Sequence, residues 1–175
     1  VAERLDERRP EKDPPADPRL VVLHAPAQAP AEAFRAMYYS LRRSLSGAPL
    51  GVVGVTSAAR GDGRSVVAAN LALVAARETS RTVALVDADL RAPALHRLFG
   101  FDGEMGLSDV VSNRCDLRSA FVAHAGGNID LLAGGEHVVL VAGRIDPHPQ
   151  VLVVADRAGD RGDALADEPG QSPAR

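Results

Sequence analysis

A glycine-rich turn between an apolar run and a long helical pattern constrains this chain more than any other feature. Residues 50–57 (LGVVGVTS) are apolar and rich in β-branched side chains, which predicts a buried strand. Residues 66–79 carry apolar side chains on two faces, a pattern typical of a helix that packs on a sheet beneath other elements. Between them, Gly61 and Gly63 allow successive backbone N–H groups to point inward, and the helix start adds positive partial charge. The order strand, glycine turn, helix therefore predicts a cradle for phosphate.

The turn departs at two positions from the phosphate-loop pattern G-x-x-x-x-G-K-[ST]. Ala58 replaces the first glycine and Arg64 replaces the lysine, whereas Ser65 keeps the hydroxyl that such loops use to bind Mg²⁺. Arginine keeps the positive charge, but its planar guanidinium is bulkier than an ammonium group. The alternative interpretation is a strand, turn and helix in which the glycines serve only the turn.

Two aspartates come after the next apolar run, VALV at residues 83–86. In a parallel sheet the carboxyl ends of neighbouring strands face one crevice, so we expect Asp87 to lie beside Ser65 and to hold a metal ion or its bound water. Asp87 or Asp89 could also accept a proton from an incoming hydroxyl group. The alternative is that each aspartate only caps the helix after it.

Strand and helix patterns alternate up to residue 132. Beyond the elements above, we expect helices at residues 32–45, 95–99, 108–111 and 117–123, and strands at 82–86 and 128–132. This alternation predicts an α/β fold, a three-layer sandwich with a mostly parallel sheet. Residues 138–141 and 151–154 also read as strands, but nine residues between them are too few for a parallel crossover. We therefore expect the sheet to be incomplete toward the C-terminus.

Composition narrows the classes of function. Twenty basic against 23 acidic residues leave a net charge of −3, so the chain offers no strongly basic face and no nucleic-acid partner is expected. Cys115 is the single cysteine, which excludes an internal disulfide and fits a reducing compartment. No apolar run approaches the ~20 residues of a membrane helix, and no signal-peptide core is present. The histidines lack metal-ligand spacing. We expect a cytoplasmic protein.

Four blocks together carry a resemblance to a known family. They are Glu32-Ala33-Phe34-Arg35, the loop ARGDGRS at residues 59–65, VDADLRAPALHRLFG at residues 86–100, and GLSDV at residues 106–110. In this order and spacing, the stretch from about residue 20 to 132 resembles the cytoplasmic domain of the bacterial tyrosine kinases (BY-kinases) of exopolysaccharide and capsule biosynthesis. That family belongs to a deviant P-loop group that also contains septum-site and partitioning ATPases. We accordingly expect a P-loop NTPase-like domain at residues 20–132.

The remaining segments do not share the resemblance. Residues 1–19 alternate acidic and basic side chains and are punctuated by prolines, so we predict a disordered arm. Residues 133–175 read as a divergent or degraded C-terminal segment, and its charged tail is expected to be largely disordered.

The resemblance implies ATP and Mg²⁺ as cofactors. It implies nucleotide contacts from Ala59, Arg60, Gly61, Asp62, Gly63, Arg64, Ser65 and Val66. It further implies that Ser65 and Asp87 hold Mg²⁺, and that Asp87, Asp89 and Arg64 have catalytic roles.

The resemblance also implies partners. A membrane polysaccharide co-polymerase or adaptor would hold the chain at the inner face of the membrane. The helix that carries Glu32 and Arg35 corresponds to the segment that the family uses for ring assembly, so it is a candidate homo-oligomer contact.

Several departures from the family pattern argue for weak or absent phosphoryl transfer. Arg64 stands at the catalytic lysine, Arg60 at a proline, and Tyr38 at the second arginine of the assembly helix. No apolar strand ends in Asp-Thr-Pro-Pro, the family's Walker B motif, and VLVVAD at residues 151–156 is the nearest imitation. The family's C-terminal tyrosine cluster is absent, since Tyr38 and Tyr39 are the only tyrosines.

The hypothesis is therefore a tyrosine-kinase-like, ATP-binding protein that regulates polysaccharide synthesis or export, with weak or no phosphoryl transfer. One alternative is a non-catalytic P-loop paralogue that acts as an interaction module. Another is a partitioning or septum-site ATPase, which is disfavoured because Ala59 occupies the position of that group's signature lysine.

Overall fold

The computed structural model describes residues 16–44, 52–79, 82–101, 103, 105–124, 128–135 and 152–156. Within these residues one sheet contains β1 (Val52–Val55), β2 (Val83–Val86), β3 (Phe121–His124), β4 (Ile129–Leu132) and β5 (Leu152–Asp156). The helices are α1 (Val21–His24), α2 (Ala29–Ser44), α3 (Arg64–Thr79), α4 (Leu95–Phe99), α5 (Leu107–Val111) and α6 (Leu117–Ala120). The predicted strand at residues 138–141 lies outside the described residues.

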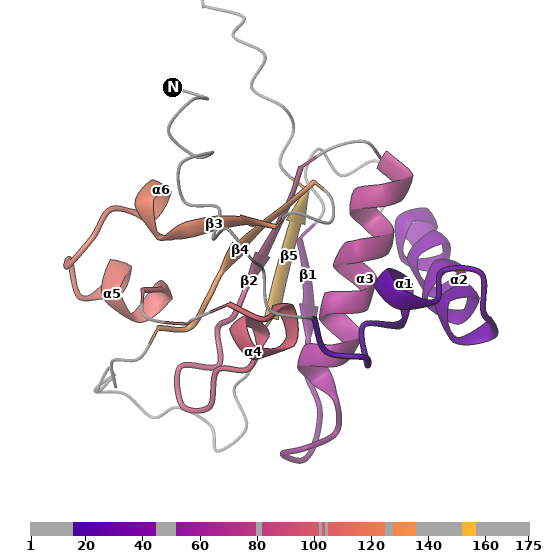
Figure 1. Ribbon diagram of the computed structural model, residues 1–175, viewed down its shortest axis with the longest axis horizontal. Coiled ribbons are helices and arrows are strands. Elements are labelled where there is room, and N and C mark those ends of the chain that lie inside the picture. The colour runs from indigo at the N-terminus through magenta and orange to yellow at the C-terminus, as the bar shows by residue number, and fades with distance from the viewer. Residues whose placement is uncertain are drawn as a thin grey trace, which may run out of the picture.

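The strand order is β1-β5-β2-β4-β3 (Figure 1). β2 and β4 pair in parallel, with Val83 opposite Ile129, whereas β5 runs antiparallel to both of its neighbours, β1 and β2. β1, β2 and β4 therefore run in one direction and β3 and β5 in the other. The α/β P-loop fold is confirmed, but the prediction of a mostly parallel sheet is wrong for the described strands, where only β2 and β4 pair in parallel and the other pairings are antiparallel.

α3 lies between the sheet and the pair α1 and α2, which cover its outer side (Figure 1). This position explains why its sequence is apolar on two faces. Much of its buried surface is alanine, which lets the helix approach the sheet closely. The large, fully buried apolar side chains of this core cluster come from four elements (α3, β2, α4 and β4) and the segment before α1: Leu20, Leu73, Leu85, Leu95, Phe99, Ile129 and Leu131.

A buried amide joins α3 to the start of the described chain. Asn70 is fully buried, and its Oδ1 accepts the backbone N–H of Val22 at 3.0 Å. Its Nδ2 donates to the carbonyl oxygens of Arg19 and Val66, both at 2.9 Å. Leu20 is fully buried beside it. Asp17 and Arg19, which the sequence placed in a disordered arm, form hydrogen bonds with Leu98 and Asn70 of the domain, and residues 1–15 lie outside the described residues.

The helix predicted at residues 117–123 is wrong in its second half. α6 ends at Ala120, and β3 begins at the next residue and pairs antiparallel with β4, with Phe121 opposite Leu132. Phe121 and Val122 favour strands, and pairing with a neighbouring strand outweighs the weak local helical pattern. The Gly126-Gly127 pair ahead of β4 is the turn signal that could have indicated this hairpin.

The GLSDV block contacts the residues that come directly after β4. The N–H of Leu107 donates to the carbonyl of Ala133 at 2.7 Å, and that of Ser108 to the carbonyl of Gly134 at 3.0 Å. A Cβ on Gly106 would lie 2.3 Å from the Ala133 oxygen, so this close approach requires glycine.

Among the described helices, none combines the length and apolarity that a membrane crossing requires.

Candidate functional site

The glycine loop connects β1 to α3, and the aspartate segment continues from β2. Because β1 and β2 run in the same direction, both segments leave the sheet at one edge (Figure 1). The ion pair between Arg64 and Asp89 joins the two segments directly. The parallel-strand argument from the sequence named Asp87 beside Ser65, which stays a prediction, whereas the contact that the structure shows is between Asp89 and Arg64.

The loop adopts a conformation that depends on its glycines. Gly61 and Gly63 have φ values of +94° and +84°, in the left-handed region, and a Cβ added at either would meet no non-neighbouring atom within 4 Å. Asp62 Oδ2 accepts the backbone N–H of Ala59 at 3.0 Å, and residues 58–62 are exposed. The loop is accessible, and one of its N–H donors is already paired with a carboxylate of the loop itself.

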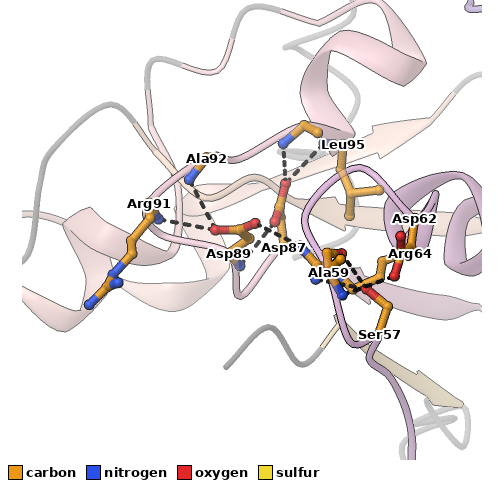
Figure 2. Close-up of polar contacts among 10 residues, drawn as sticks. Ser57, Ala59, Asp62, Arg64, Asp87, Asp89, Arg91, Ala92 and Leu95 are labelled. Carbon is orange, nitrogen blue, oxygen red and sulfur yellow. Dashed lines mark hydrogen bonds and ion pairs between the residues drawn. The ribbon is translucent and has the colours of Figure 1, made fainter. Parts of the chain in front are cut away.

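Arg64 is the first residue of α3, and its side chain folds back across the loop (Figure 2). Its Nη1 donates to Ser57 Oγ at 2.9 Å and to the Ala59 carbonyl at 3.4 Å. Its Nη2 lies 3.7 Å from Asp89 Oδ2. The Arg64 side chain is only 11% exposed, so the guanidinium that replaces the usual lysine points into the site rather than into solvent.

Asp87 is the most buried carboxylate of the site, at 1% exposure. Its Oδ2 accepts the backbone N–H groups of Ala94 and Leu95 at 2.8 and 2.9 Å, and its Oδ1 accepts that of Asp89 at 3.1 Å. Ala94, the N-cap residue of α4, offers no side-chain acceptor, so Asp87 caps this helix from β2. Burial raises the pKa of Asp87 above its ordinary value of 3.8, and the three backbone donors oppose that rise.

The two carboxylate oxygens of Asp89 have different partners. Its Oδ1 accepts the backbone N–H groups of Arg91 and Ala92 at 3.3 and 3.0 Å, which closes the turn after β2. Its Oδ2 faces Arg64. The alternative from the sequence, in which each aspartate caps the helix after it, thus describes Asp87, whereas Asp89 closes a turn and caps no described helix.

The donor set can be compared with the groups that the sequence implies. An open glycine loop at the start of a long helix, with Arg64 beside it, suits a phosphate group. A carboxylate oxygen accepts two hydrogen bonds, so Asp87 Oδ2 is saturated, whereas Oδ1 accepts one and keeps capacity for a cation. Among the hydrogen bonds of the described residues none joins Ser65 to Asp87, and their joint role at Mg²⁺ stays a prediction. Ser57, whose Oγ accepts a hydrogen bond from the Arg64 guanidinium, was not identified from the sequence.

The predicted assembly helix, α2, is tied to α3 within the same chain. Arg35 forms ion pairs with Glu32 and, at 3.3 Å from its Nε, with Glu78 Oε1. The Tyr39 hydroxyl donates to the other oxygen of Glu78, which raises the pKa of Tyr39 above its ordinary value. Glu78 was not identified from the sequence, because nothing local indicates which side chain of α3 meets α2.

The chain is similar in sequence to several bacterial tyrosine-protein kinases. It is 30% identical to the tyrosine-protein kinase YwqD of Bacillus subtilis over 134 residues, which cover 77% of this chain and 53% of YwqD. It is 30% identical to the tyrosine-protein kinase etk of Escherichia coli K12 over 132 residues, which cover 75% of this chain and 17% of etk. It is 29% identical to the tyrosine-protein kinase wzc of Salmonella typhi over 142 residues, 81% of this chain and 18% of wzc. The chain thus spans about half of one relative and less than a fifth of the others.

Solved structures share the fold. The kinase domain of the Escherichia coli tyrosine kinase ETK matches with a TM-score of 0.64 and 27% identity, over 79% of this chain and 54% of that domain. The chimerical protein CapA2B2 matches with a TM-score of 0.62 and 26% identity, over 71% of this chain and 54% of the chimera. No family model matches the chain.

Proposed function

The chain belongs with the bacterial tyrosine-protein kinases, as a homologue of their kinase domain, and from this premise we propose that it binds ATP or ADP through residues 59–66 and transfers phosphate weakly or not at all. In this proposal it regulates polysaccharide synthesis or export at the cytoplasmic face of the membrane, together with a membrane co-polymerase partner. Contacts between copies would use the α2 helix around Glu32 and Arg35.

The observation that carries the proposal is the loop between β1 and α3. Its two left-handed glycines leave the backbone open, and it leads into a helix of 16 residues whose N-terminus attracts anions. Arg64 supplies a positive charge at the first helical position, and Ser65 supplies a hydroxyl next to it. An exposed loop of this kind suits the phosphates of a nucleotide.

In the proposed complex, Ser65 and Asp87 Oδ1 would hold Mg²⁺, which neutralises phosphate charge and orients the transferred group. The chain's own residues bind and orient the nucleotide: the loop N–H groups and Arg64 contact phosphate. Asp87 or Asp89 would accept the proton of an attacking hydroxyl, as the sequence predicts.

Weak transfer is supported by the position of β5. Its first residue, Leu152, pairs with Val55 at the loop edge of the sheet, and its last residue, Asp156, pairs with Val83 at the opposite edge. Because β5 is antiparallel to its neighbours, the strand that imitates Walker B ends in its aspartate away from the loop. The substitution of arginine for the loop lysine acts in the same direction.

The interaction-module alternative is favoured by a specific observation. In the structure, the N–H of Ala59 donates to Asp62, and Arg64 forms an ion pair with Asp89. Two groups that would contact phosphate therefore already have partners within the chain. A protein of this kind would keep the fold and its partner contacts while it binds nucleotide poorly. The partitioning-ATPase alternative has no comparable support.

Calorimetric titration with ADP and ATP, with magnesium and with a chelator, tests the proposal. We expect weak, saturable binding that Arg64→Ala lowers, while Arg97→Ala, a substitution of an exposed arginine on α4, leaves it unchanged. Asp87→Asn is expected to remove the magnesium-dependent part of the affinity. An absence of binding by every form, including Arg64→Lys, would favour the interaction module.

A further inference from the structure

We propose that Asp89 sets the nucleotide affinity of the loop by holding Arg64 across it, so that a bound phosphate must take Arg64 away from Asp89. The inference rests on the proposed nucleotide-binding function and names the residue that controls it. Asp89 would be a positioning residue that acts through Arg64.

The guanidinium of Arg64 contacts two segments, the start of the glycine loop and the turn after β2 (Figure 2). Ser57 Oγ and the Ala59 carbonyl accept from its Nη1, and Asp89 Oδ2 lies 3.7 Å from its Nη2. The two side chains of the ion pair are 11% and 16% exposed. Because little water screens them, their attraction exceeds that of a pair on the open surface.

Asp89 cannot follow Arg64 toward a ligand. Its Oδ1 is bound by the N–H groups of Arg91 and Ala92, and its own N–H donates to Asp87 Oδ1. The carboxylate is therefore fixed to the turn after β2, whereas Arg64 has a long side chain with rotatable bonds. When phosphate enters the loop, Arg64 must either give up its contact with Asp89 or remain unused.

The Asp89 carboxylate and a bound phosphate would compete for the same cation, the guanidinium of Arg64. Arginine binds phosphate through paired, charge-assisted hydrogen bonds, so a nucleotide phosphate is a strong rival for the guanidinium. Removal of the Asp89 charge should free Arg64 and strengthen binding. A carboxylate that serves as a metal ligand or a base would show the opposite behaviour, because its removal weakens binding or transfer.

The loop contains a matched control. Asp62 is a second carboxylate close to the phosphate position, and it pairs with the Ala59 N–H rather than with Arg64. Asp62→Asn thus removes the same charge as Asp89→Asn without a change in the partners of Arg64. Asparagine at position 89 keeps an oxygen that can accept the N–H groups of Arg91 and Ala92, so the turn after β2 is retained.

The experiment measures ADP affinity by calorimetry, with chelator and with magnesium, for the unmodified chain, Asp89→Asn, Asp62→Asn, Arg64→Ala and the double variant Arg64→Ala/Asp89→Asn. We expect Asp89→Asn to tighten binding about fivefold in both conditions, in line with a partly shielded ion pair. Asp62→Asn removes a nearby charge and releases the Ala59 N–H but leaves the ion pair between Asp89 and Arg64, so its gain in affinity should be smaller than that of Asp89→Asn. In the Arg64→Ala background, Asp89→Asn should have no effect.

Three results would overturn the inference. Unchanged or weaker ADP binding by Asp89→Asn is the first. If the affinity falls only when magnesium is present, Asp89 would be a ligand of the metal. Tightening that persists without Arg64 is the second, since it would reflect general charge. If no variant binds nucleotide, the proposed function falls and this inference falls with it, whereas binding with unchanged affinity in Asp89→Asn removes the inference alone. Thermal unfolding verifies folding, and Asp89→Ser replaces Asp89→Asn if the latter does not fold.

Discussion

Asp87, at the end of β2, accepts the backbone N–H of Leu95 at 2.9 Å and so caps α4 from a neighbouring element. The same oxygen accepts the N–H of Ala94, and the carboxylate is 1% exposed. The residue predicted to hold metal is thus also a structural anchor for the segment between β2 and α4. Both roles can be separated by experiment.

Asp87→Ala should destabilise the fold strongly. The substitution leaves the N–H groups of Asp89, Ala94 and Leu95 without their acceptor, and buried donors that lose a charged partner cost about 3 kcal/mol in the free energy of unfolding. Urea unfolding measures the loss. Asp116→Ala is the matched control, because Asp116 caps α6 in an exposed position and its removal should cost much less. Equal stability of Asp87→Ala and the unmodified chain would contradict the capping role.

The pH dependence of stability should carry the signature of Asp87. Burial raises its pKa in the folded state, so above pH 3.8 the folded chain binds a proton more readily than the unfolded chain. The contribution of Asp87 to stability should therefore be largest at low pH and fall as pH rises through its folded pKa. Urea midpoints of the unmodified chain relative to Asp87→Asn, measured from pH 3.5 upward, test this direction. A difference that grows with rising pH would refute it.

Asp17 should show the opposite behaviour. Its hydrogen bonds with Arg19 lower its pKa from 3.8 to about 2, so its contribution is present above pH 3.8 and is lost as pH falls toward 2. The titration of its carboxyl carbon by NMR measures this pKa directly. In Arg19→Ala the value should return toward 3.8, while Arg97→Ala, on the exposed side of α4, should leave it unchanged.

Much of the site was predictable because its determinants are local. The strand, glycine turn and helix around Gly63 follow from periodicity and turn chemistry. The common edge of β1 and β2 brings Asp89 to Arg64, a contact that was not predicted, and the predicted meeting of Asp87 with Ser65 stays a prediction. The insertion of β5 between β1 and β2 was not predictable, since strand order is decided by pairing between distant segments. The capping of α4 by Asp87 was considered only as an alternative, because the spacing of two aspartates does not reveal which N–H groups they meet.

The role of Asn70 also escaped the sequence analysis, and its replacement should loosen the N-terminal segment. In Asn70→Ala the N–H of Val22 and the carbonyl of Arg19 lose their partner in a buried place, which should cost about 3 kcal/mol in the free energy of unfolding. Hydrogen exchange should accelerate first in α1. Asn128→Ala, on an exposed asparagine before β4, should leave both measurements near those of the unmodified chain.

Arg64→Lys should tighten nucleotide binding. The guanidinium contacts Ser57, Ala59 and Asp89 together, and a lysine ammonium is a compact charge without the planar fork that spans these acceptors. The lysine is then available to the phosphates in the loop. Calorimetric titration with ADP measures the gain, and weaker binding by Arg64→Lys than by the unmodified chain would contradict the argument.

The same substitution should restore little phosphoryl transfer. Catalysis of this reaction relies on positioning and charge stabilisation, and the loss of a single preorganised donor costs about 10²–10³ in rate. Arg64→Lys restores one such group, but β5 still places Asp156 at the far edge of the sheet, opposite Val83. A radiolabel transfer assay on both forms should therefore remain near background. Strong autophosphorylation of the unmodified chain at Tyr38 or Tyr39 would show instead that Arg64 and the present strand order support catalysis.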